Sequence, residues 1–266
     1  MPGEIWSSRH AGRSFIITGG GSGIGRATAL RLAREGAQVA IADVRGELAE
    51  AVLHEVEALG GRGLALQCDV GREPEVEAMV TASAAAFGRI DGLFSNAGTA
   101  GRGWIHETTL DDWERVIRVN LTGAFLCSKH VLPHLLTHQR GVIVTTGSIA
   151  SVVIGAGGSA ASYAASKGGL LQLTRQIAVD YGSQGIRAVC LCPGAVKTNL
   201  GPHAIEDRQG QAAPASGPLP RAKPWTPIPR AAESDEMAAA VSFLFSDDAS
   251  FITGTALFVD GGLTAI

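Results

Sequence analysis

The sequence predicts one α/β domain, in which a parallel sheet of seven strands is doubly wound and carries helices on both faces. Two observations support this fold class. Seven short runs rich in valine, isoleucine and leucine are bounded by turn residues, as buried parallel strands are. Longer segments with a helical period of apolar residues separate these runs. This alternation of strand and helix is typical of a doubly wound sheet.

Each predicted strand is a continuous apolar run, which favours burial on both faces of the sheet. In chain order the runs cover residues 15–17, 39–42, 64–66, 92–94, 142–144, 188–191 and 256–259. Between the second and third runs, Leu48, Val52 and Val56 recur at helical spacing, and Val76 and Val80 do so after the third run. Each strand is therefore expected to be followed by a helix that packs on the sheet.

The alternation continues from residue 14 to residue 262 without a linker that would separate two domains. We therefore expect an N-terminal arm (1–13) followed by one domain (14–266). Seven of the eleven prolines lie between Gly201 and Arg230. An irregular segment of this length inside a compact domain is usually a lid, a binding loop or a disordered stretch. We expect the segment 201–230 to be the substrate loop.

The composition excludes several classes of protein. Glycine accounts for 35 of 266 residues, but no Gly-X-Y repeat occurs, so collagen is excluded. With 45% hydrophobic residues and a net charge of −3, the chain is unlike a disordered protein and lacks the basic surface of a nucleic-acid-binding protein. Residues 1–13 contain no apolar signal-peptide core, and no stretch reaches the ~18 apolar residues of a membrane span. We expect a cytoplasmic protein without a membrane partner.

The four cysteines form no CxxC pair, which argues against a zinc site and a disulfide framework. Cys190 and Cys192 flank one leucine on a predicted strand and are expected to face the same side. His130, His134 and His138 repeat at a spacing that could suggest a metal, but Pro133 lies among them and no carboxylate is adjacent in the sequence. We expect exposed or interfacial histidines, reduced thiols and no metal.

Five glycines crowd the turn 18–25, whose sequence is Thr-Gly-Gly-Gly-Ser-Gly-Ile-Gly. The turn follows the first strand and opens a predicted helix over 24–35. Glycine allows a tight turn and a close approach of the backbone to a pyrophosphate, which the helix N-terminus attracts. A Walker A loop is excluded because Arg26 and Ala27 follow the last glycine in place of lysine and serine or threonine. The residues expected to bind the cofactor here are Gly19, Ser22, Gly23, Ile24 and Gly25.

Asp43 ends the second predicted strand, where a carboxylate can accept hydrogen bonds from the adenosine ribose hydroxyls. A purely structural glycine turn would not require an acid at this place. The carboxylate would repel a 2′-phosphate, and no basic residue lies between Gly19 and Gly25, although Arg26 and Arg45 are close enough in sequence to compensate. The sequence therefore favours NAD as the cofactor over NADP.

Tyr163 and Lys167 stand four residues apart in a segment of helical period that runs to Tyr181. This spacing places both side chains on one face of a helix. A lysine ammonium beside a phenol favours the phenolate and lowers the pKa of the phenol from about 10, so the tyrosine can exchange a proton with an alcohol or carbonyl oxygen near neutral pH. An ordinary helix can carry the same pair, and the remaining motifs decide between the two interpretations.

The chain resembles the short-chain dehydrogenase/reductase family, whose motifs it shows in the family's order over nearly its whole length. The resemblance implies a Rossmann-type sheet, a nicotinamide cofactor and a homotetramer. The motifs that carry it are the turn 18–25 (TGxxxGxG), Asp69-Val70 after the third strand, Asn96-Ala97-Gly98 after the fourth, Asn120, Ser148, Tyr163 with Lys167, the segment from Pro193-Gly194 through Val196 to Thr198 (PGxVxT), and Val259-Asp260-Gly261-Gly262 (VDGG).

The resemblance also implies a role for each catalytic side chain. Tyr163 is the general acid or base, and Lys167 lowers its pKa and holds the nicotinamide ribose. Ser148 hydrogen-bonds the substrate oxygen and stabilises the charge that develops there, while Asn120 holds a water that links Lys167 to solvent. Hydride passes between the substrate carbon and the nicotinamide C4.

Other motifs are assigned by the resemblance to cofactor binding. Asp69 and Val70 meet the adenine. Asn96 and its two successors stabilise the sheet and border the cofactor. The full set of cofactor residues beyond the glycine turn is Asp43, Asp69, Val70, Asn96, Ala97, Gly98, Tyr163, Lys167, Pro193, Gly194, Val196 and Thr198.

Two positions depart from the family pattern. Ser148 and Tyr163 are separated by more residues than the family usually shows, and the extra residues lie in 155–159, so we expect a longer flexible loop at the rim of the pocket. Ser151 is too close to Tyr163 in sequence to take the place of Ser148. Ser95 stands where many members have a second asparagine, and we expect little consequence.

The residues expected to line a substrate pocket are largely apolar: Trp104, Ile105 and His106, residues 152–154, and the proline-rich segment. No arginine clamp for a carboxylate or phosphate is evident. The leading hypothesis is an NAD-dependent oxidoreductase acting on a hydrophobic or cyclic secondary alcohol and its ketone. The alternatives are a 3-oxoacyl thioester reductase and, from another class, a non-catalytic dinucleotide-binding sensor. The sensor is disfavoured because the catalytic set is complete.

Overall fold

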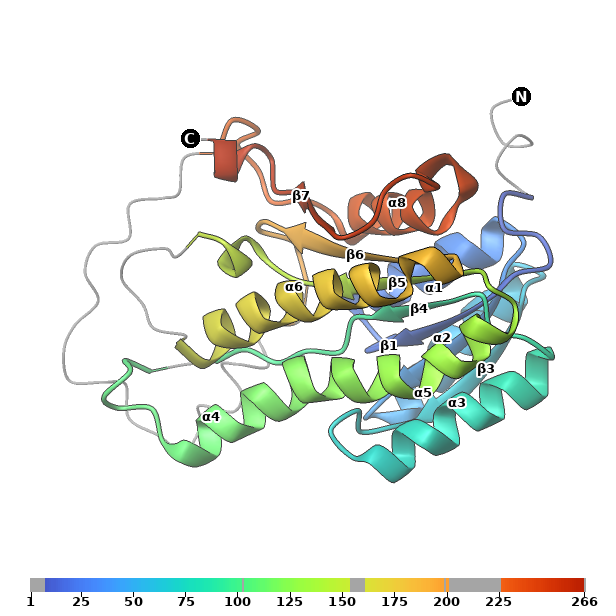
Figure 1. Ribbon diagram of the computed structural model, residues 1–266, viewed down its shortest axis with the longest axis horizontal. Coiled ribbons are helices and arrows are strands. Elements are labelled where there is room, and N and C mark those ends of the chain that lie inside the picture. The colour runs from blue at the N-terminus through green and yellow to red at the C-terminus, as the bar shows by residue number, and fades with distance from the viewer. Residues whose placement is uncertain (1–7, 102, 154–160, 199, 201–225, 266) are drawn as a thin grey trace.

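The computed structural model describes residues 8–101, 103–153, 161–198, 200 and 226–265. Seven parallel strands form one sheet in the order β3-β2-β1-β4-β5-β6-β7, with helices on both faces (Figure 1). The predicted fold class is confirmed, and each predicted run lies within one strand. The strands are β1 (Ser14–Thr18), β2 (Gln38–Asp43), β3 (Arg62–Gln67), β4 (Gly92–Ser95), β5 (Gly141–Thr146), β6 (Ile186–Pro193) and β7 (Thr255–Val259).

The two faces of the sheet bury separate apolar cores. Successive side chains of a strand point to opposite faces, and β1 accordingly contributes Phe15 and Ile17 to one core and Ile16 to the other. The first core is closed by α1 (Gly23–Arg34), α2 (Gly46–Ala58) and α8 (Ser234–Phe245). The second is closed by α3 (Glu73–Phe87), α5 (Gly123–Thr137) and α6 (Ala161–Tyr181). Burial on both faces explains why the strands read as continuous apolar runs.

The order of the strands places a crevice at the carboxyl end of the sheet. β1 lies between β2 and β4, so the chain extends the sheet first to one side and then to the other. The loops that follow β1 and β4 therefore diverge, and ligands of doubly wound sheets bind where they do. The glycine turn follows β1 and Asn96 follows β4, so both motifs border this crevice.

α4 (Leu110–Ile117) continues into α5 through a π-helical turn at Arg118–Thr122. Within this turn the Gly123 N–H donates to the Arg118 carbonyl, one residue further back than in an α-helix. Asn120 lies inside the turn and is buried. The apolar pattern of the sequence does not predict the turn, because a single wide turn leaves the helical period almost unchanged.

One of the three histidines for which the sequence predicts no metal has a specific partner. His130 Nε2 lies 3.1 Å from Glu73 Oε1 of α3, a carboxylate that is distant in sequence. Within the described ranges, no group of three or more histidine, cysteine or acidic side chains could hold a metal ion. Among the same residues, no helix is both long enough and apolar enough to cross a bilayer.

Candidate active site

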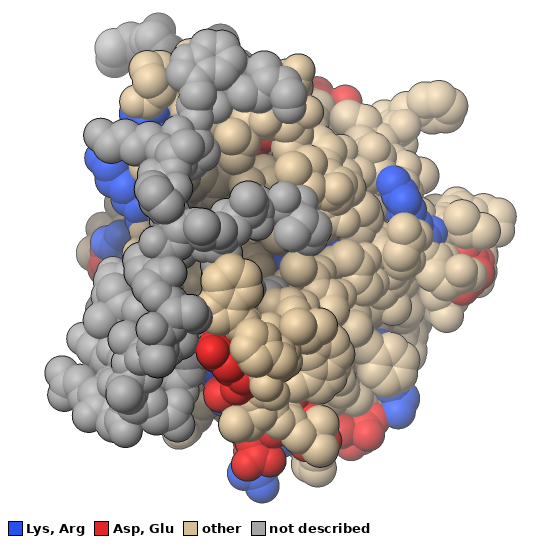
Figure 2. Space-filling model, turned by 90° about the vertical axis from the view of Figure 1, so that its left-hand side faces the viewer, with Lys and Arg blue, Asp and Glu red and all other residues tan. Residues whose placement is uncertain are grey.

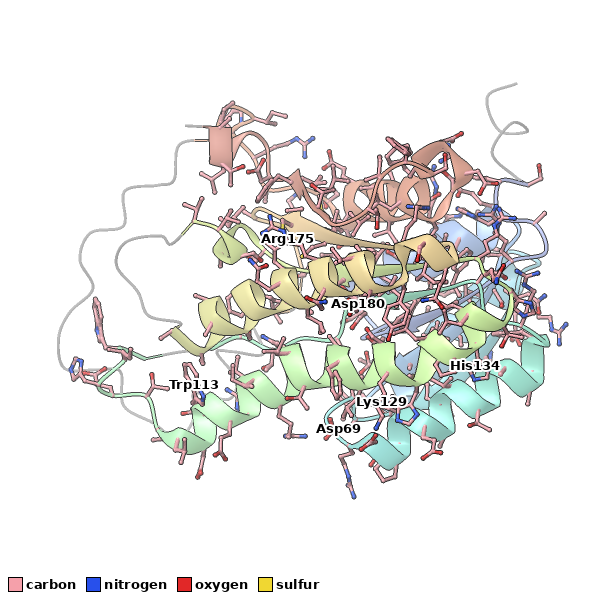
Figure 3. All side chains as sticks on the ribbon, in the orientation of Figure 1. Asp69, Trp113, Lys129, His134, Arg175 and Asp180 are labelled. Carbon is pink, nitrogen blue, oxygen red and sulfur yellow. The ribbon has the colours of Figure 1, made fainter. Side chains whose placement is uncertain are left out.

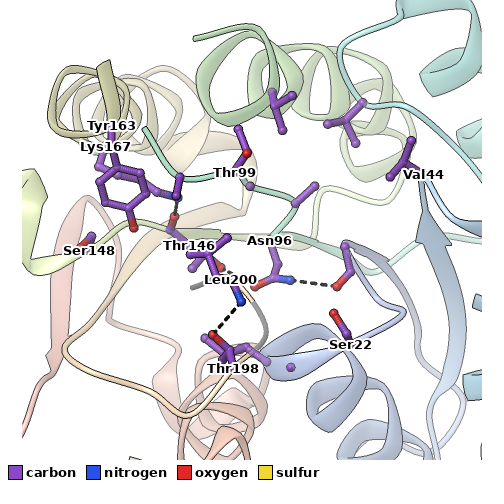
Figure 4. A pocket seen from close by; sticks show the side chains of 18 of the residues that line it. Ser22, Val44, Asn96, Thr99, Thr146, Ser148, Tyr163, Lys167, Thr198 and Leu200 are labelled. Carbon is purple, nitrogen blue, oxygen red and sulfur yellow. Dashed lines mark hydrogen bonds between the residues drawn. The ribbon is translucent and has the colours of Figure 1, made fainter. Parts of the chain in front are cut away.

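A pocket of about 610 Å³ lies at the carboxyl ends of β1, β2, β4, β5 and β6 (Figure 4). Its wall contains most of the residues expected from the sequence to bind a cofactor or act in catalysis. These are Gly19, Ser22, Gly23, Ile24, Asp43, Asp69, Val70, Asn96, Ala97, Gly98, Ser148, Tyr163, Lys167, Pro193, Gly194, Val196 and Thr198. Gly25 and Asn120 do not line the pocket; both are buried behind its wall.

The glycine turn has several positions where a side chain is not tolerated, and two of them, Gly19 and Gly25, set its shape. Gly19 has a φ of +61°, which residues with a Cβ rarely adopt. A Cβ at Gly25 would lie 2.0 Å from the Gly19 carbonyl oxygen, so α1 starts in direct contact with the end of β1. The turn therefore presents bare backbone and the N-terminus of α1 to the pocket, an arrangement that binds phosphate groups.

Asp43 is held by the backbone of this turn. Its Oδ2 accepts a hydrogen bond from Gly21 N at 3.0 Å and its Oδ1 accepts one from Arg45 N at 3.1 Å, although the side chain is almost fully buried. Arg26 is directed elsewhere, because its guanidinium donates to Glu55 of α2, with Nε at 2.8 Å from Oε1. Arg45 lines the pocket. Of the two arginines that could offset the charge of Asp43 toward a ligand, only Arg45 is therefore in place.

Asn96 ties three strand ends together below the pocket. Its Nδ2 donates to the carbonyl oxygens of Thr18 (3.1 Å) and Gly19 (3.2 Å), and its Oδ1 accepts from Thr146 Oγ1 (3.1 Å). The backbone N–H groups of Asn96 and Ala97 both donate to Thr18 Oγ1. These bonds satisfy buried polar groups at the ends of β1, β4 and β5, so the floor of the pocket is rigid.

Asp69 and Arg118 form an ion pair at 2.9 Å on the rim of the pocket. Partial burial opposes ionisation of this carboxyl group, but the hydrogen bonds from Gly71 N and the Arg118 guanidinium outweigh it and lower the pKa of Asp69 below its ordinary value. The side chain is therefore an anion held in one orientation. Arg118 was not expected from the sequence to line the pocket.

Tyr163, Lys167 and Ser148 lie together at one end of the pocket, and Ser22 and Val44 lie at the other (Figure 4). The Lys167 side chain is buried, and its Nζ donates to the Thr146 carbonyl oxygen at 2.6 Å. The same ammonium lies 5.5 Å from the centroid of the Tyr163 ring. An ammonium has three donors, so this contact leaves donors for other partners. Thr146, whose carbonyl holds the ammonium, carries no motif that would have identified it.

Ser148 begins the short 3₁₀ turn Ile149–Ser151 that follows β5. Its hydroxyl oxygen accepts a hydrogen bond from Ala150 N at 3.1 Å, and its own N–H donates to Ser151 Oγ at 3.2 Å. The oxygen is thus already used as an acceptor of a backbone N–H. Its proton can be donated into the pocket.

Asn120 braces this end of the pocket from behind. Its Oδ1 accepts from Thr99 N at 2.7 Å, and its Nδ2 donates to Thr99 O and to Ser166 Oγ, both at 3.0 Å. Ser166 in turn donates to the Tyr163 carbonyl oxygen at 2.7 Å. The side chain of Asn120 therefore links the loop after β4 to the helix that carries Tyr163.

The wall differs in part from the expected apolar lining. Arg115 lines the pocket and donates from Nη1 to Thr99 Oγ1 at 2.9 Å. Ile105 and Val152 do not line it and are exposed, with 76% and 51% of their surface accessible. Residues 154 and 201–225, which were expected to border the substrate, lie outside the described residues. In Figure 2, which shows this end of the molecule, the coloured charged side chains lie mainly toward the periphery.

The residues present fit a nicotinamide dinucleotide. The pocket offers bare backbone at a helix N-terminus for a pyrophosphate, the oriented carboxylate of Asp43 for ribose hydroxyls, and the buried ammonium of Lys167 for a second ribose. Figure 4 shows Ser22 of the glycine turn and Val44, the neighbour of Asp43, at one end of the pocket and Tyr163 and Lys167 at the other. A dinucleotide, whose two riboses flank the pyrophosphate, can therefore extend from Asp43 past the glycine turn to Lys167.

Comparison with known proteins agrees with this geometry. The family model that matches residues 19–264 is described as enoyl-(acyl carrier protein) reductase. A meso-2,3-butanediol dehydrogenase from Serratia marcescens is 40% identical over 97% of this chain and 96% of its own. A 2,5-dichloro-2,5-cyclohexadiene-1,4-diol dehydrogenase from Sphingobium indicum is 41% identical over 96% of this chain and 98% of its own. The solved structure of a 7α-hydroxysteroid dehydrogenase with NADH and 7-oxoglycochenodeoxycholic acid covers 97% of both chains with a TM-score of 0.85 and 31% identity.

Proposed function

The chain belongs to the short-chain dehydrogenase/reductase family and is an oxidoreductase with a nicotinamide cofactor; from this premise we propose that it uses NAD to interconvert a hydrophobic or cyclic secondary alcohol and its ketone. Relatives named for a butanediol and a cyclohexadienediol support this substrate class. The observation that carries the proposal is the buried Lys167 ammonium, held by Thr146 O beside the Tyr163 ring and Ser148, in the same pocket as Asp43.

The side chains act on the substrate oxygen. A bound nicotinamide supplies or accepts the hydride. The Tyr163 phenol, which lies beside the Lys167 ammonium, exchanges a proton with the substrate oxygen. Ser148 donates its hydroxyl proton in a hydrogen bond to the same oxygen and stabilises the charge that develops there. Asn120 keeps the loop after β4 and the start of α6 in register, and a water held beside it would connect Lys167 to solvent.

The test is Tyr163→Phe, which removes the hydroxyl and leaves the ring. We expect kcat to fall by about a hundredfold to ten-thousandfold, the range for loss of a general acid or base, while NADH binding measured by fluorescence stays within about threefold of the wild type. The matched control is Tyr181→Phe, because Tyr181 is the chain's other tyrosine and lies at the far end of the same helix. Unchanged turnover in Tyr163→Phe would show that the assignment is wrong.

The preference for NAD rests on Asp43. A 2′-phosphate beside this buried carboxylate meets a like charge, and Arg26 is engaged with Glu55. We expect kcat/KM to favour NAD over NADP in the wild type. Asp43→Asn should reduce this preference by at least about tenfold, because it removes the repulsion between the carboxylate and the 2′-phosphate. Arg45→Ala is the companion variant and should lower the remaining activity with NADP. A wild-type preference for NADP would contradict the role given to Asp43.

The substrate class is tested with one panel. Cyclic and open-chain secondary alcohols are compared with 3-oxoacyl and enoyl thioesters, and the absorbance of the reduced nicotinamide is followed. We expect the highest kcat/KM for a cyclic or apolar secondary alcohol. Higher activity with an acyl thioester would favour the reductase alternative, in keeping with the description of the family model.

We also propose a homotetramer, which the family resemblance implies. Three apolar side chains on α4 and α5 support an oligomer: Leu110, Trp113 and Phe125 are 68%, 37% and 48% exposed. Figure 3 shows Trp113 on the same side of the molecule as Lys129 and His134 of α5. Light scattering coupled to size exclusion gives the mass directly, and a monomer at micromolar concentration would contradict the proposal. A cytoplasmic location stays a prediction.

A further inference from the structure

A set of hydroxyl and thiol groups behind Ser148, all buried except the half-buried Ser151, has no part in the chemistry described so far. It consists of Ser151, Cys192, Cys190, Thr145 and Thr174, which come from the turn after β5, from β6, from β5 and from α6. The two cysteines and the two threonines are completely buried, and all four belong to strands or helices of the domain core. As the sequence predicts, Cys190 and Cys192 face the same side of β6, with their sulfurs 3.8 Å apart.

These groups form one continuous series of contacts. The Ser148 N–H donates to Ser151 Oγ at 3.2 Å. Ser151 Oγ lies beside the sulfurs of Cys190 and Cys192, because all three atoms surround the same point next to Gly147. Cys192 contacts Cys190, and Cys190 is the partner of Thr145 across the neighbouring strands β6 and β5. The hydroxyl oxygens of Thr145 and Thr174 are 2.8 Å apart, and Thr174 Oγ1 lies 2.7 Å from the Leu170 carbonyl oxygen. The series thus starts at the backbone of Ser148 and ends at the backbone of α6.

The donors can be assigned at both ends of the series. Thr174 donates to Leu170 O, because a carbonyl can only accept. The proton between Thr145 and Thr174 then belongs to Thr145. At the other end of the series, Ser151 Oγ accepts from Ser148 N.

Two further observations concern the middle of the series. The contact with Cys190, together with burial, raises the pKa of Cys192 above its ordinary value, whereas the contact with Cys192 outweighs burial and lowers the pKa of Cys190 to about 7, so Cys192 is the donor of the two. Gly147, between β5 and Ser148, has no room for a side chain, because a Cβ would lie 2.6 Å from Cys190 Sγ, 2.9 Å from Cys192 Sγ and 3.0 Å from Ser151 Oγ. The three polar atoms are therefore packed directly against the backbone that precedes Ser148.

We propose that this series of polar contacts positions Ser148 against the helix that carries Tyr163 and Lys167, with Ser151 and Cys192 as positioning residues. The inference rests on the catalytic role proposed above for Ser148. A buried network in which every member is satisfied is rigid, whereas one that lacks a member leaves a buried donor or acceptor unpaired. Leu170, where the series ends, lies about two helical turns from Tyr163 on α6. The series therefore fixes the distance between the two groups that must reach one substrate oxygen.

The experiment is a double-mutant cycle between Ser148 and Ser151. Ser151→Ala should lower kcat about tenfold, because Ser148 N loses its acceptor and the hydroxyl moves away from its working position, whereas NADH affinity by fluorescence should stay within about twofold. In a Ser148→Ala background the same change should lower kcat no further, because there is no hydroxyl left to position. Equal losses in both backgrounds would mean a general structural effect and would overturn the inference.

Substitutions further along the series supply the second arm. Cys192→Ala removes both a donor and an acceptor, while Cys192→Ser keeps them, so Ala should reproduce the loss of Ser151→Ala and Ser should restore kcat to within about threefold of the wild type. Thr174→Val and Thr174→Ser form a second pair, almost equal in shape to threonine, for use if a Cys192 variant does not fold. Equal kcat in Cys192→Ala and Cys192→Ser, or in both Thr174 variants, would overturn the inference.

The two proposals fail in different ways. If Ser148→Ala turns over like the wild type, the role given to Ser148 is wrong. If Ser148→Ala is impaired and Ser151→Ala is not, Ser148 is catalytic but the series does not position it. Thermal unfolding by circular dichroism accompanies each variant, so that a loss of folded protein is not counted as a loss of kcat.

Discussion

The two ends of the sheet are held together by different interactions. At the carboxyl end, Asn96 and Thr18 bind backbone groups of neighbouring strands without any charge. At the amino end, Arg13 and Arg140 both donate to Asp247, and Arg187 donates to the carbonyl oxygens that end α8 and follow it. The first arrangement keeps donors and charges open toward a pocket. The second pairs nearly every charge it contains, which suits an end of the molecule that only has to stay closed.

The largest effect is expected when a glycine is replaced by alanine at the carboxyl end. The same replacement at the amino end should leave NADH affinity unchanged. In Gly25→Ala the new Cβ would lie 2.0 Å from Gly19 O, so the turn must shift away from the position that approaches a phosphate. We expect NADH affinity to fall at least about a hundredfold, equivalent to about 2.7 kcal/mol. Gly182→Ala lies before β6 at the amino end, and a Cβ there meets nothing within 4 Å.

For Gly182→Ala we expect the free energy of unfolding to stay within about 0.5 kcal/mol of the wild type and NADH affinity to be unchanged. NADH titration followed by fluorescence and urea unfolding measure both quantities. If Gly25→Ala binds NADH as the wild type does, the glycine turn is not what receives the cofactor.

The carboxyl end could be predicted from the sequence because its residue types are local signals. Glycine in the turn and an aspartate at the end of a strand each have a short-range physical reason, so position along the chain was enough to bring Gly19 and Asp43 together. The seven strands were predictable for a related reason, since burial on both faces leaves few polar residues in them. Tyr163 and Lys167 share a helix face, which follows from spacing alone.

The rest depends on contacts between residues that are distant in sequence. Thr146 holds Lys167 through a backbone carbonyl, which any residue type would provide. Arg115 of α4 and Arg118 of the π-helical turn lie on the pocket wall only because this part of the chain packs beside the crevice. The amphipathic pattern of a helix does not show which charge faces a ligand. His10 contacts Glu35, which is more than twenty residues further along the chain, and Ser242, which is near the C-terminus. No local pattern of the sequence therefore indicates either partner.

The second prediction concerns acid and the amino end. His10 is completely buried, with Nε2 3.2 Å from Ser242 Oγ and 3.4 Å from Glu35 Oε2. Burial lowers the pKa of His10 from 6.5 to about 4, opposed by Glu35 and assisted by Arg13 and Arg9. A depressed pKa means that the folded state is favoured above pH 6.5 and loses this advantage as the pH falls toward 4. The loss should reach about 3 kcal/mol.

Urea unfolding at a series of pH values between 7.5 and 4 tests this expectation. His10→Gln is the control, because an amide can replace the hydrogen bond to Ser242 and does not titrate. We expect the variant to be less sensitive to acid over this range and to have wild-type turnover at neutral pH. A variant as sensitive to acid as the wild type would show that other groups, and not His10, govern acid unfolding.

The smallest effect is expected where the charges are most numerous. Asp247 accepts hydrogen bonds at 2.7 Å from both Arg13 and Arg140. The bond from Arg13, helped by the bond from Arg140, lowers the pKa of Asp247 below its ordinary value, although partial burial opposes this shift. The Asp247 side chain is nevertheless 72% exposed. Exposed ion pairs contribute about 0–1 kcal/mol and are screened by salt. We therefore expect Asp247→Asn to lower the free energy of unfolding by less than about 1 kcal/mol. In 1 M salt, charges more than about 3 Å apart are largely screened, so the difference between the variant and the wild type should become smaller still.

Urea unfolding at low and high salt measures this difference, with turnover as the check on the distant pocket. A loss above about 2 kcal/mol would mean that the three-charge cluster acts as a network, since isolated exposed pairs do not reach that value. The contrast with His10 then decides what holds the amino end closed. The buried imidazole of His10 should matter more than the cluster of Asp247, Arg13 and Arg140, although the distances within the cluster are shorter. Water competes for the exposed side chains of Asp247 and Arg140 and cannot reach the buried imidazole.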